Sequence, residues 1–202
     1  MLTGIVFCGG KSLRMGRDKG LLKKGFITWA ESAFQKLECL GIKVMLSVNE
    51  TQLETYRHIF PEEFLIIDKP SSVFNLEGPL KGLLSVHQQL PQSDLFILAC
   101  DMTDISIPLL WKLKNAFLVD QLNYDHFTYT NEGNYEPMCA IYGSRKLDEI
   151  NKTALNHQLK VFSMKQILFT GKTLGIPVDK SEAAFFTNYN EKINVQQMSV
   201  EQ

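Results

Sequence analysis

The segment FCGGKSLRMGRDKGLL, residues 7–22, combines closely spaced glycines with cationic side chains. Glycine allows several backbone N–H groups to approach one anion, because no side chain blocks the approach. Gly9 and Gly10 are placed for this role, and Arg14 and Lys19 can add charge-assisted hydrogen bonds. The residue types therefore predict a phosphate-binding loop. The competing interpretation is a flexible loop whose cations are solvated.

Two standard phosphate motifs do not fit this segment. A P-loop ending in GKS at residues 10–12 needs glycine at position 5, where the chain has Ile5, and Gly4 is one residue away. The dinucleotide pattern G-x-G-x-x-G starting at Gly10 fails at Ser12. The sequence therefore favours neither a P-loop ATPase nor a dinucleotide-dependent dehydrogenase.

Asp101 directly follows LFILAC, the most apolar run in the chain. A carboxylate at the end of a buried strand is costly unless it is paired or binds a metal. Magnesium binds one or two carboxylates and completes its shell with phosphate oxygens and water. We therefore expect Asp101 to bind Mg²⁺. The competing interpretation is a capping or turn aspartate before MTDISIP.

No set of residues typical of nucleophilic catalysis is evident. The histidines lie in different segments and near no obvious nucleophile, and we interpret each as surface or satisfied core: His58, His87, His126 and His157. Nucleotidyl transfer to a phosphate acceptor needs no strong general base, since the attacking oxygen is already anionic. Positioning, metal and cations supply most of the catalysis in such reactions.

Composition restricts the class of protein. The chain has 202 residues, 45% of them hydrophobic, and a net charge of −1, so it lacks the global basic field expected for nucleic-acid binding. Its cysteines form no C-x-x-C pair and indicate reduced, buried thiols: Cys8, Cys39, Cys100 and Cys139. We find no signal peptide and no apolar run of about 18 residues. We expect a cytoplasmic protein that binds neither membrane nor nucleic acid.

Strand and helix patterns alternate through the first part of the chain. Hydrophobic periodicity predicts strands at 3–8, 43–48, 64–68 and 95–100, and helices at 27–40, 52–60, 80–90 and 108–122. This alternation is typical of a mostly parallel sheet with helices on both faces. Residues 126–142 then predict two strands, followed by helices near 145–156 and 163–169 and a strand at 172–178. We expect a single α/β domain, 1–202, with a β-rich insertion at about 126–142.

These motifs resemble those of one family, the molybdenum cofactor guanylyltransferases (MobA family). FCGGKSLRMGRDK resembles its L-A-G-G-x-S-x-R-M-G-x-D-K signature. EGPLKGLLS, ACDMTDIS, EPMCAIY and FTNYNEKIN are similar to its later motifs, in the same order, up to about residue 194. The resemblance implies a Rossmann-like three-layer nucleotidyltransferase fold. It also implies transfer of GMP from GTP to molybdopterin or Mo-molybdopterin, giving molybdopterin guanine dinucleotide and pyrophosphate.

The resemblance also implies roles for particular residues. The residues expected to line the nucleotide are Phe7, Cys8, Gly9 and Gly10. Those expected to hold the triphosphate are Arg14 and Lys19, with Lys19 nearest the developing charge. Nucleoside contacts would come from Asn49 and Asp68, and the pocket floor from Gly78 and Pro79. Asp101 would bind Mg²⁺, or Mn²⁺ as an alternative, and Asn188 and Asn190 would lie on the acceptor or metal side.

Other interpretations of these residues stay open. Asn49 is also a plausible helix cap, Asp68 a turn residue before Lys69-Pro70, and Asn188 and Asn190 are compatible with an exposed strand edge. The chain departs from the family pattern at Phe7-Cys8, Thr28, Thr103 and Glu191-Lys192, and none of these changes removes an expected ligand.

Two further functions compete with guanylyl transfer. The same fold and first motif serve cytidylyl transfer to molybdopterin and nucleotidyl transfer to sugar or alditol phosphates. A carboxylate at Asp68 favours guanine, which offers N1 and N2 donors, whereas cytosine offers a donor only at N4. The non-enzyme alternative is a nucleotide-binding adaptor that delivers cofactor. The partners expected besides the substrates are molybdenum cofactor biosynthesis proteins and apo-molybdoenzymes.

Overall fold

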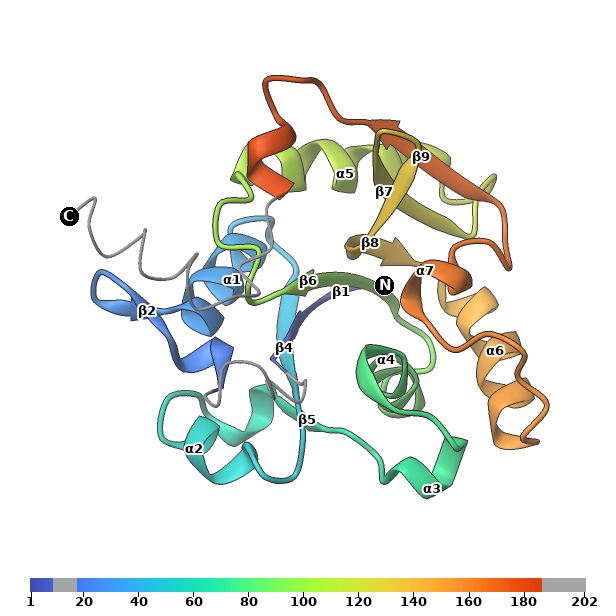
Figure 1. The fold of residues 1–202 in the computed structure, drawn as a ribbon, viewed down its shortest axis with the longest axis horizontal. Coiled ribbons are helices and arrows are strands. Elements are labelled where there is room, and N and C mark those ends of the chain that lie inside the picture. Colours follow the sequence, from blue (N-terminus) through green and yellow to red (C-terminus); the bar gives the residue numbers. More distant parts are fainter. Residues whose placement is uncertain (9–17, 187–202) are drawn as a thin grey trace.

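The computed structural model describes residues 1–8 and 18–186, and its centre is a seven-stranded sheet with the order β5-β4-β1-β6-β8-β7-β9 (Figure 1). Only β8 runs antiparallel to its neighbours, β6 and β7. The predicted α/β fold with a mostly parallel sheet is therefore confirmed. The strands of this sheet are β1 (Leu2–Phe7), β4 (Lys43–Val48), β5 (Leu65–Ile67), β6 (Asp94–Ala99), β7 (His126–Asn131), β8 (Asn134–Tyr142) and β9 (Thr173–Pro177).

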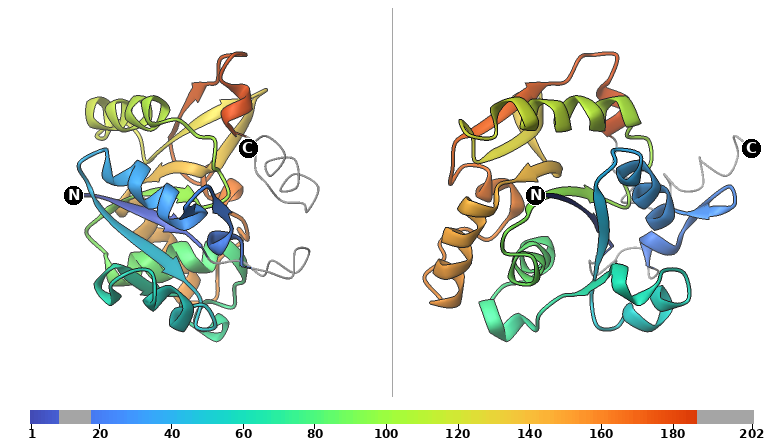
Figure 2. Two further views of the ribbon diagram at one scale, coloured as in Figure 1. Left: turned by 90° about the vertical axis from the view of Figure 1, so that its left-hand side faces the viewer. Right: turned by 180° about the vertical axis from the view of Figure 1, so that it is seen from behind.

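Helices cover both faces of the sheet, as the sequence predicts (Figures 1 and 2). One face is covered by α1 (Trp29–Glu38) and α5 (Ile107–Asp120), and the other by α4 (Gly78–Gln89), α6 (Ser144–Leu155) and α7 (Met164–Ile167). The remaining described elements are short: η1 (Lys19–Leu21), β2 (Lys23–Lys24), β3 (Ile27–Thr28), α2 (Leu53–Arg57), η2 (Glu62–Phe64), α3 (Ser71–Phe74) and η3 (Ala183–Phe186).

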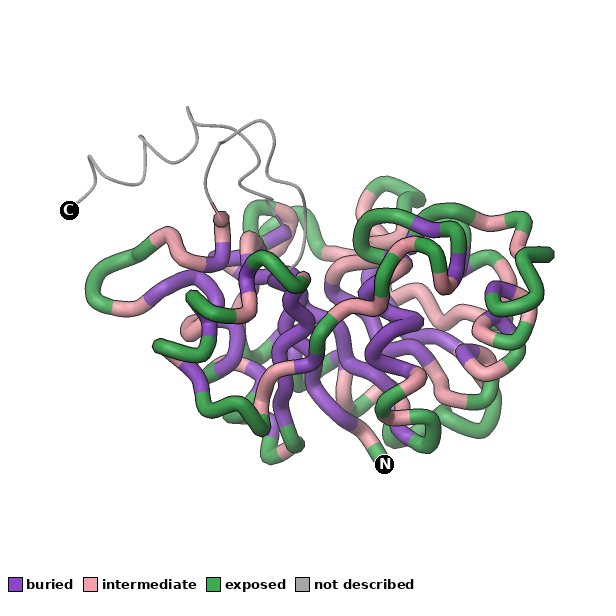
Figure 3. The backbone as a smooth tube through the Cα atoms, turned by 90° about the horizontal axis from the view of Figure 1, so that it is seen from below, coloured by how far each residue is buried: buried purple, intermediate pink, exposed green. Residues whose placement is uncertain are grey.

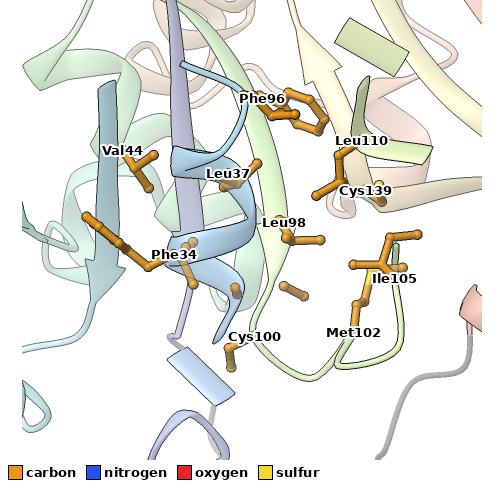
Figure 4. Close-up of a cluster of buried hydrophobic side chains, with 14 of the residues drawn as sticks. Phe34, Leu37, Val44, Phe96, Leu98, Cys100, Met102, Ile105, Leu110 and Cys139 are labelled. Carbon is orange, nitrogen blue, oxygen red and sulfur yellow. The ribbon is translucent and has the colours of Figure 1, made fainter. Parts of the chain in front are cut away.

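Side chains of the central strands alternate between two hydrophobic cores. On β6, Leu95 and Ile97 face α4, whereas Phe96 and Leu98 face α1 and α5 (Figure 4). This alternation follows from the period of two in a strand, and both sets are apolar because both faces are covered. The central strands are accordingly buried along most of their length (Figure 3).

Helix α1 begins at a capping box formed by the Thr-x-x-Glu pattern of residues 28–31, so its first residue is Trp29 and not residue 27 as predicted. The Thr28 hydroxyl accepts from the Glu31 backbone N–H (3.1 Å), and the Glu31 carboxylate accepts from the Thr28 backbone N–H (2.7 Å). A cap of this kind stabilises a helix by about 1 kcal/mol. Threonine at this departure from the family pattern therefore provides a helix start of its own.

The segment 126–142, expected as a β-rich insertion, forms the hairpin β7–β8. Glu132 and Gly133 make its turn, both with positive φ (48° and 78°). Strand β8 pairs with β6 from Leu95↔Tyr142 to Leu98↔Cys139, so the hairpin extends the main sheet. This pairing brings the amino-terminal end of β8 to the edge where β6 ends.

Within the described residues, the helices are too short or too polar to cross a membrane; the longest, α5, has 14 residues.

His126 makes the stability of the fold depend on pH. Its side chain is fully buried against the Tyr142 ring (5.3 Å between centroids), and neither ring nitrogen hydrogen-bonds to a residue in the described ranges. Burial lowers the pKa of His126 to about 4, despite the opposing effect of Asp125. Between this pKa and the ordinary value of 6.5, the unfolded chain binds the proton more tightly. The contribution of neutral His126 to the unfolding free energy is therefore fully present above pH 6.5 and is lost as the pH falls toward 4.

His126→Phe is expected to remove this dependence. The wild-type unfolding free energy should fall by about 3 kcal/mol between pH 6.5 and 4 through this residue, and the variant should lack that part of the slope. Urea unfolding at several pH values measures it. His58→Phe, at an exposed position, is the control. An unchanged slope in His126→Phe would contradict the prediction.

Candidate active site at the carboxyl edge of the sheet

Polar residues follow several neighbouring strands where the carboxyl ends of these strands meet. Asn49 follows β4, Asp68 follows shortly after β5, and Asp101 follows β6 after one residue. Because β5, β4, β1 and β6 are parallel neighbours, these residues lie along one edge of the sheet. Ligands of open α/β sheets bind at this edge.

Lys19 and Asp101 form an ion pair at this edge. The Lys19 ammonium lies 2.9 Å from Asp101 Oδ2, and the two side chains are only 17% and 16% exposed. The residues are 82 positions apart in the sequence, so the fold alone brings them together. The two groups that the sequence assigned to charge stabilisation and to metal binding are thus direct neighbours.

Two more lysines hold the loop that follows Asp101. Lys24 pairs with Asp104 at 2.9 Å, and Lys36 donates to the backbone oxygen of Thr103 (2.5 Å). Burial lowers the pKa of Lys36, and the nearby Asp104 partly opposes this. These contacts tie the loop after Asp101 to the hairpin β2–β3 and to helix α1.

A pocket of about 790 Å³ opens beside the ends of β1, β4 and β5. The amino-terminal turn of α4 forms another side, and Gly78 there has a φ of +69°, which favours glycine. Five predicted nucleotide residues line this pocket: Phe7, Asn49, Asp68, Gly78 and Pro79. Among its other lining residues are Ser47, Glu50, Thr51, Lys69, Glu77, Lys81 and Gly82.

Asp68 presents one carboxylate oxygen to the pocket. Its Oδ1 accepts from the Ser47 hydroxyl (2.7 Å), and no hydrogen bond to Oδ2 is found among the described residues. A Cβ on Gly82 would lie 3.1 Å from Ser47 Oγ and 3.4 Å from Asp68 Oδ1, so glycine leaves space for this pair. Burial raises the pKa of Asp68, although the Ser47 hydrogen bond and Lys81 oppose the shift.

Asn49 both holds the turn before α2 and lines the pocket. Its side-chain oxygen accepts from the Thr51 hydroxyl (2.6 Å) and from the Gln52 backbone N–H (3.0 Å). The oxygen therefore holds the turn before α2, whose N-cap is Gln52, so Asn49 is not the helix cap itself. The side-chain N–H₂ group has no hydrogen bond to a described residue. Asn49 also lines the pocket, so its amide group can still serve a ligand.

Cys8 is placed differently from its neighbour Phe7. The Cys8 side chain is buried in the core next to Cys100, and it does not line the pocket. The hydrogen bond with Cys8 and burial raise the pKa of Cys100. These thiols fill the core beneath the site, and Cys139 is buried as well. Cys39 is exposed near the end of α1, so the prediction of buried thiols is wrong for that residue.

Five predicted site residues lie outside the residues that the structure describes: Gly9, Gly10, Arg14, Asn188 and Asn190. Their roles stay predictions.

Sequence reasoning did not identify Ser47, Gln52 or Gly82. Ser47 carried a signal, because it is a polar residue within the apolar strand KVMLSV and close to its end. Gly82 lies in the motif EGPLKGLLS, but its sequence neighbours do not show which side chains it packs against. Gln52 carried no signal, since polar residues are ordinary at the start of a short helix.

Comparison with known proteins supports the same family as these motifs. The family model of the MobA-like NTP transferase domain matches residues 4–168. The chain belongs to this family. It is therefore a nucleotidyltransferase of the α/β class, and the recognition made from the motifs is confirmed.

Individual relatives agree with this assignment. A probable molybdenum cofactor guanylyltransferase from Methanothermobacter thermautotrophicus is 24% identical over 92% of both chains. A molybdenum cofactor biosynthesis bifunctional protein from Synechocystis sp. is 29% identical over 81% of this chain, which spans about half (46%) of that protein's length. The crystal structure of molybdopterin-guanine dinucleotide biosynthesis protein A from Archaeoglobus fulgidus superposes with a TM-score of 0.74. It covers 99% of this chain and 98% of its own at 18% identity, and so shows a common fold.

Proposed function

We propose that the protein transfers GMP from GTP to molybdopterin or Mo-molybdopterin. An oxygen of the terminal phosphate of the acceptor attacks the α-phosphorus of GTP and forms a new P–O bond. The bond from the α-phosphorus to the bridging oxygen breaks, and pyrophosphate leaves with that electron pair. The products are molybdopterin guanine dinucleotide and pyrophosphate.

The Lys19–Asp101 pair, at the same edge of the sheet as the pocket, is the observation that carries this proposal. A nucleoside bound in the pocket by Asn49 and Asp68 would direct its phosphates toward this pair, since Asn49, Asp68 and Asp101 follow parallel strands at one edge of the sheet and Lys19 pairs with Asp101. The Lys19 ammonium would donate to the phosphate oxygens on which charge accumulates. Fixed cations at developing charge are a large source of rate enhancement in phosphate chemistry.

The side chains at this edge fit a magnesium ion. The donor set offers the single carboxylate of Asp101, and no cluster of three or more His, Cys, Asp or Glu residues that could hold a metal occurs among the described residues. Magnesium suits such a set, because substrate phosphates and water complete its shell. When bound, the ion would polarise the phosphate oxygens; Mn²⁺ is an alternative. Asp101 would hold it, and Lys19 would then be released from the ion pair to contact the phosphates.

Asp68 provides the basis for choosing guanine. Asp68 Oδ1 accepts one hydrogen bond from Ser47 and keeps a second lone pair, so both carboxylate oxygens can accept from a base. Guanine presents two adjacent donors, N1–H and N2–H, to one carboxylate, whereas cytosine presents only its N4 donors. Molybdenum cofactor biosynthesis proteins and apo-molybdoenzymes remain proposed partners, and the β7–β8 side of the site is the proposed place for the acceptor.

The proposal is tested by pyrophosphate release with Mg²⁺ and molybdopterin, run in parallel with GTP, CTP, ATP and UTP. Release with GTP alone supports it. Release with CTP alone keeps the chemistry and overturns the choice of base. No release with any nucleotide points to a sugar-phosphate acceptor or to a cofactor-delivery adaptor. Nucleotide binding is measured in the same samples. Binding without pyrophosphate release indicates one of these two alternatives, whereas loss of binding indicates a failed preparation.

Asp68 should also make GTP binding depend on pH. The carboxylate accepts from guanine only when ionised, so KM for GTP should rise as the pH falls through its raised pKa. A hydrogen bond to a charged group contributes about 1.5–3 kcal/mol, which corresponds to a rise in KM of about 10–100-fold. Asp68→Asn should have the high KM at every pH. Asp104→Asn, in the loop after β6, is the control and should keep the wild-type profile. A flat wild-type profile would contradict the role of Asp68.

A further inference from the structure

Asp18 is held by three donors from two segments. Its Oδ1 accepts from the Gly20 backbone N–H (2.9 Å) and from the Tyr56 hydroxyl (3.2 Å), and its Oδ2 accepts from Gln52 Nε2 (2.6 Å). Asp18 precedes Lys19 and caps the turn η1, which contains Lys19. The Asp18 carboxylate therefore fixes the backbone from which the Lys19 side chain extends. We call Asp18, Gln52 and Tyr56 the Asp18 cluster.

Gln52 connects this turn to two strands of the sheet. Its Nε2 also donates to the backbone oxygen of Cys8, just after β1 (2.9 Å), and its Oε1 accepts from the Asn49 backbone N–H, just after β4 (3.0 Å). The residue is only 8% exposed, so these bonds are largely shielded from water. One side chain thus links the ends of β1 and β4 to the segment that carries Lys19.

Tyr56 and Gly20 fit each other closely. Tyr56 is fully buried, and a Cβ on residue 20 would lie 2.0 Å from its hydroxyl oxygen. Glycine at this position therefore lets the η1 backbone pack directly on the Tyr56 hydroxyl. Burial is the main reason that the pKa of Tyr56 is raised, so the hydroxyl remains protonated and remains a donor to Asp18.

We propose that Gln52 and Tyr56 are positioning residues that act through Asp18 to hold Lys19 beside Asp101. Both side chains donate to the Asp18 carboxylate, and their effect passes through the η1 backbone. The kinetic consequence rests on the proposed nucleotidyl transfer. A displacement of a catalytic group by about 1 Å can cost about 100-fold in rate, so a network of this kind matters for turnover.

The first test compares Gln52→Met and Tyr56→Phe with wild type in the pyrophosphate assay. Both variants should lose about 10–100-fold in kcat. In Tyr56→Phe the KM for GTP should change much less, since the Tyr56 hydroxyl donates to Asp18, which does not line the pocket. Tyr56→Phe keeps the ring that stacks on Phe60, so it tests the hydroxyl even if Gln52→Met is poorly folded. The controls are Gln35→Met, exposed on α1, and Tyr124→Phe, at the opposite edge of the sheet.

A double-mutant cycle with Lys19→Met separates positioning from a general structural role. If the Asp18 cluster acts through Lys19, Tyr56→Phe should cause no further loss of kcat once Lys19 is absent. The proposal would be overturned if the kcat losses of Tyr56→Phe and Lys19→Met multiplied fully in the double variant. It would also be overturned if Gln52→Met and Tyr56→Phe both kept the wild-type kcat.

Hydrogen exchange gives a measurement that needs no substrate. The Gly20 amide should exchange at least about 10-fold faster in Tyr56→Phe and Gln52→Met, while amides of the central strand β1 keep their protection. Unchanged exchange at Gly20 would overturn the proposal. If wild type released no pyrophosphate with any nucleotide, the proposed function would fail, and this measurement would still decide whether the cluster holds the turn.

Discussion

Lys19→Met is expected to lower kcat for pyrophosphate release by about 10²–10³-fold, the usual cost of removing one preorganised charge-stabilising donor. Lys19 is largely buried and lies 2.9 Å from Asp101, so no solvent cation can replace it at that point. The substitution keeps an unbranched apolar side chain, one atom shorter than lysine, and removes the charge and the donors. Single-turnover kinetics with saturating GTP measures the chemical step directly.

The effect on stability should be smaller and should not account for the loss of turnover. Removing Lys19 leaves a mostly buried carboxylate without its ion-pair partner, which costs about 1–3 kcal/mol. Lys24→Met is the matched control, because Lys24 forms an ion pair of the same length, 2.9 Å, with Asp104 in the same loop. The Lys24 side chain is 51% exposed, and such pairs contribute about 0–1 kcal/mol. Wild-type turnover in Lys19→Met, or an equal loss in Lys24→Met, would remove Lys19 from the mechanism.

Asp101→Asn is expected to lower turnover by about 10²–10³-fold at low Mg²⁺, because metal polarisation of a phosphoryl group contributes several kcal/mol to the barrier. The amide oxygen of asparagine can still accept from Lys19, so the change mainly removes the negative charge that would attract the ion. The Mg²⁺ concentration for half-maximal turnover should therefore rise sharply. Titration of activity with Mg²⁺, and separately with Mn²⁺, measures this.

Asp104→Asn provides the comparison for Asp101→Asn. It removes a carboxylate three residues further along the same loop, one that pairs with Lys24. Its Mg²⁺ requirement should equal that of wild type. If Asp101→Asn kept both the wild-type turnover and the wild-type Mg²⁺ requirement, Asp101 would be a structural partner of Lys19 and the metal site would have to be sought elsewhere.

Most elements could be predicted from local patterns. The strand predicted at 43–48 is observed at Lys43–Val48, and the helix expected from Pro108 begins one residue earlier, at Ile107. These predictions succeed because both faces of the sheet are buried and the strands are continuous apolar runs. The short helix α3 (Ser71–Phe74) was missed, since four residues give too little periodicity to recognise.

The sequence by itself determined the family, the order of strands and helices, and the residues that follow the strands, including Asn49, Asp68 and Asp101. Burial imposes a periodic pattern over a few neighbouring residues, so each strand or helix can be predicted from its own residues. The tertiary structure alone decided that Lys19 meets Asp101, that Ser47 holds Asp68, and that the 126–142 hairpin joins the main sheet. It also decided that Gln52 ties the ends of β1 and β4 to Asp18. These contacts depend on strand register and on packing between distant segments, and no local pattern records either.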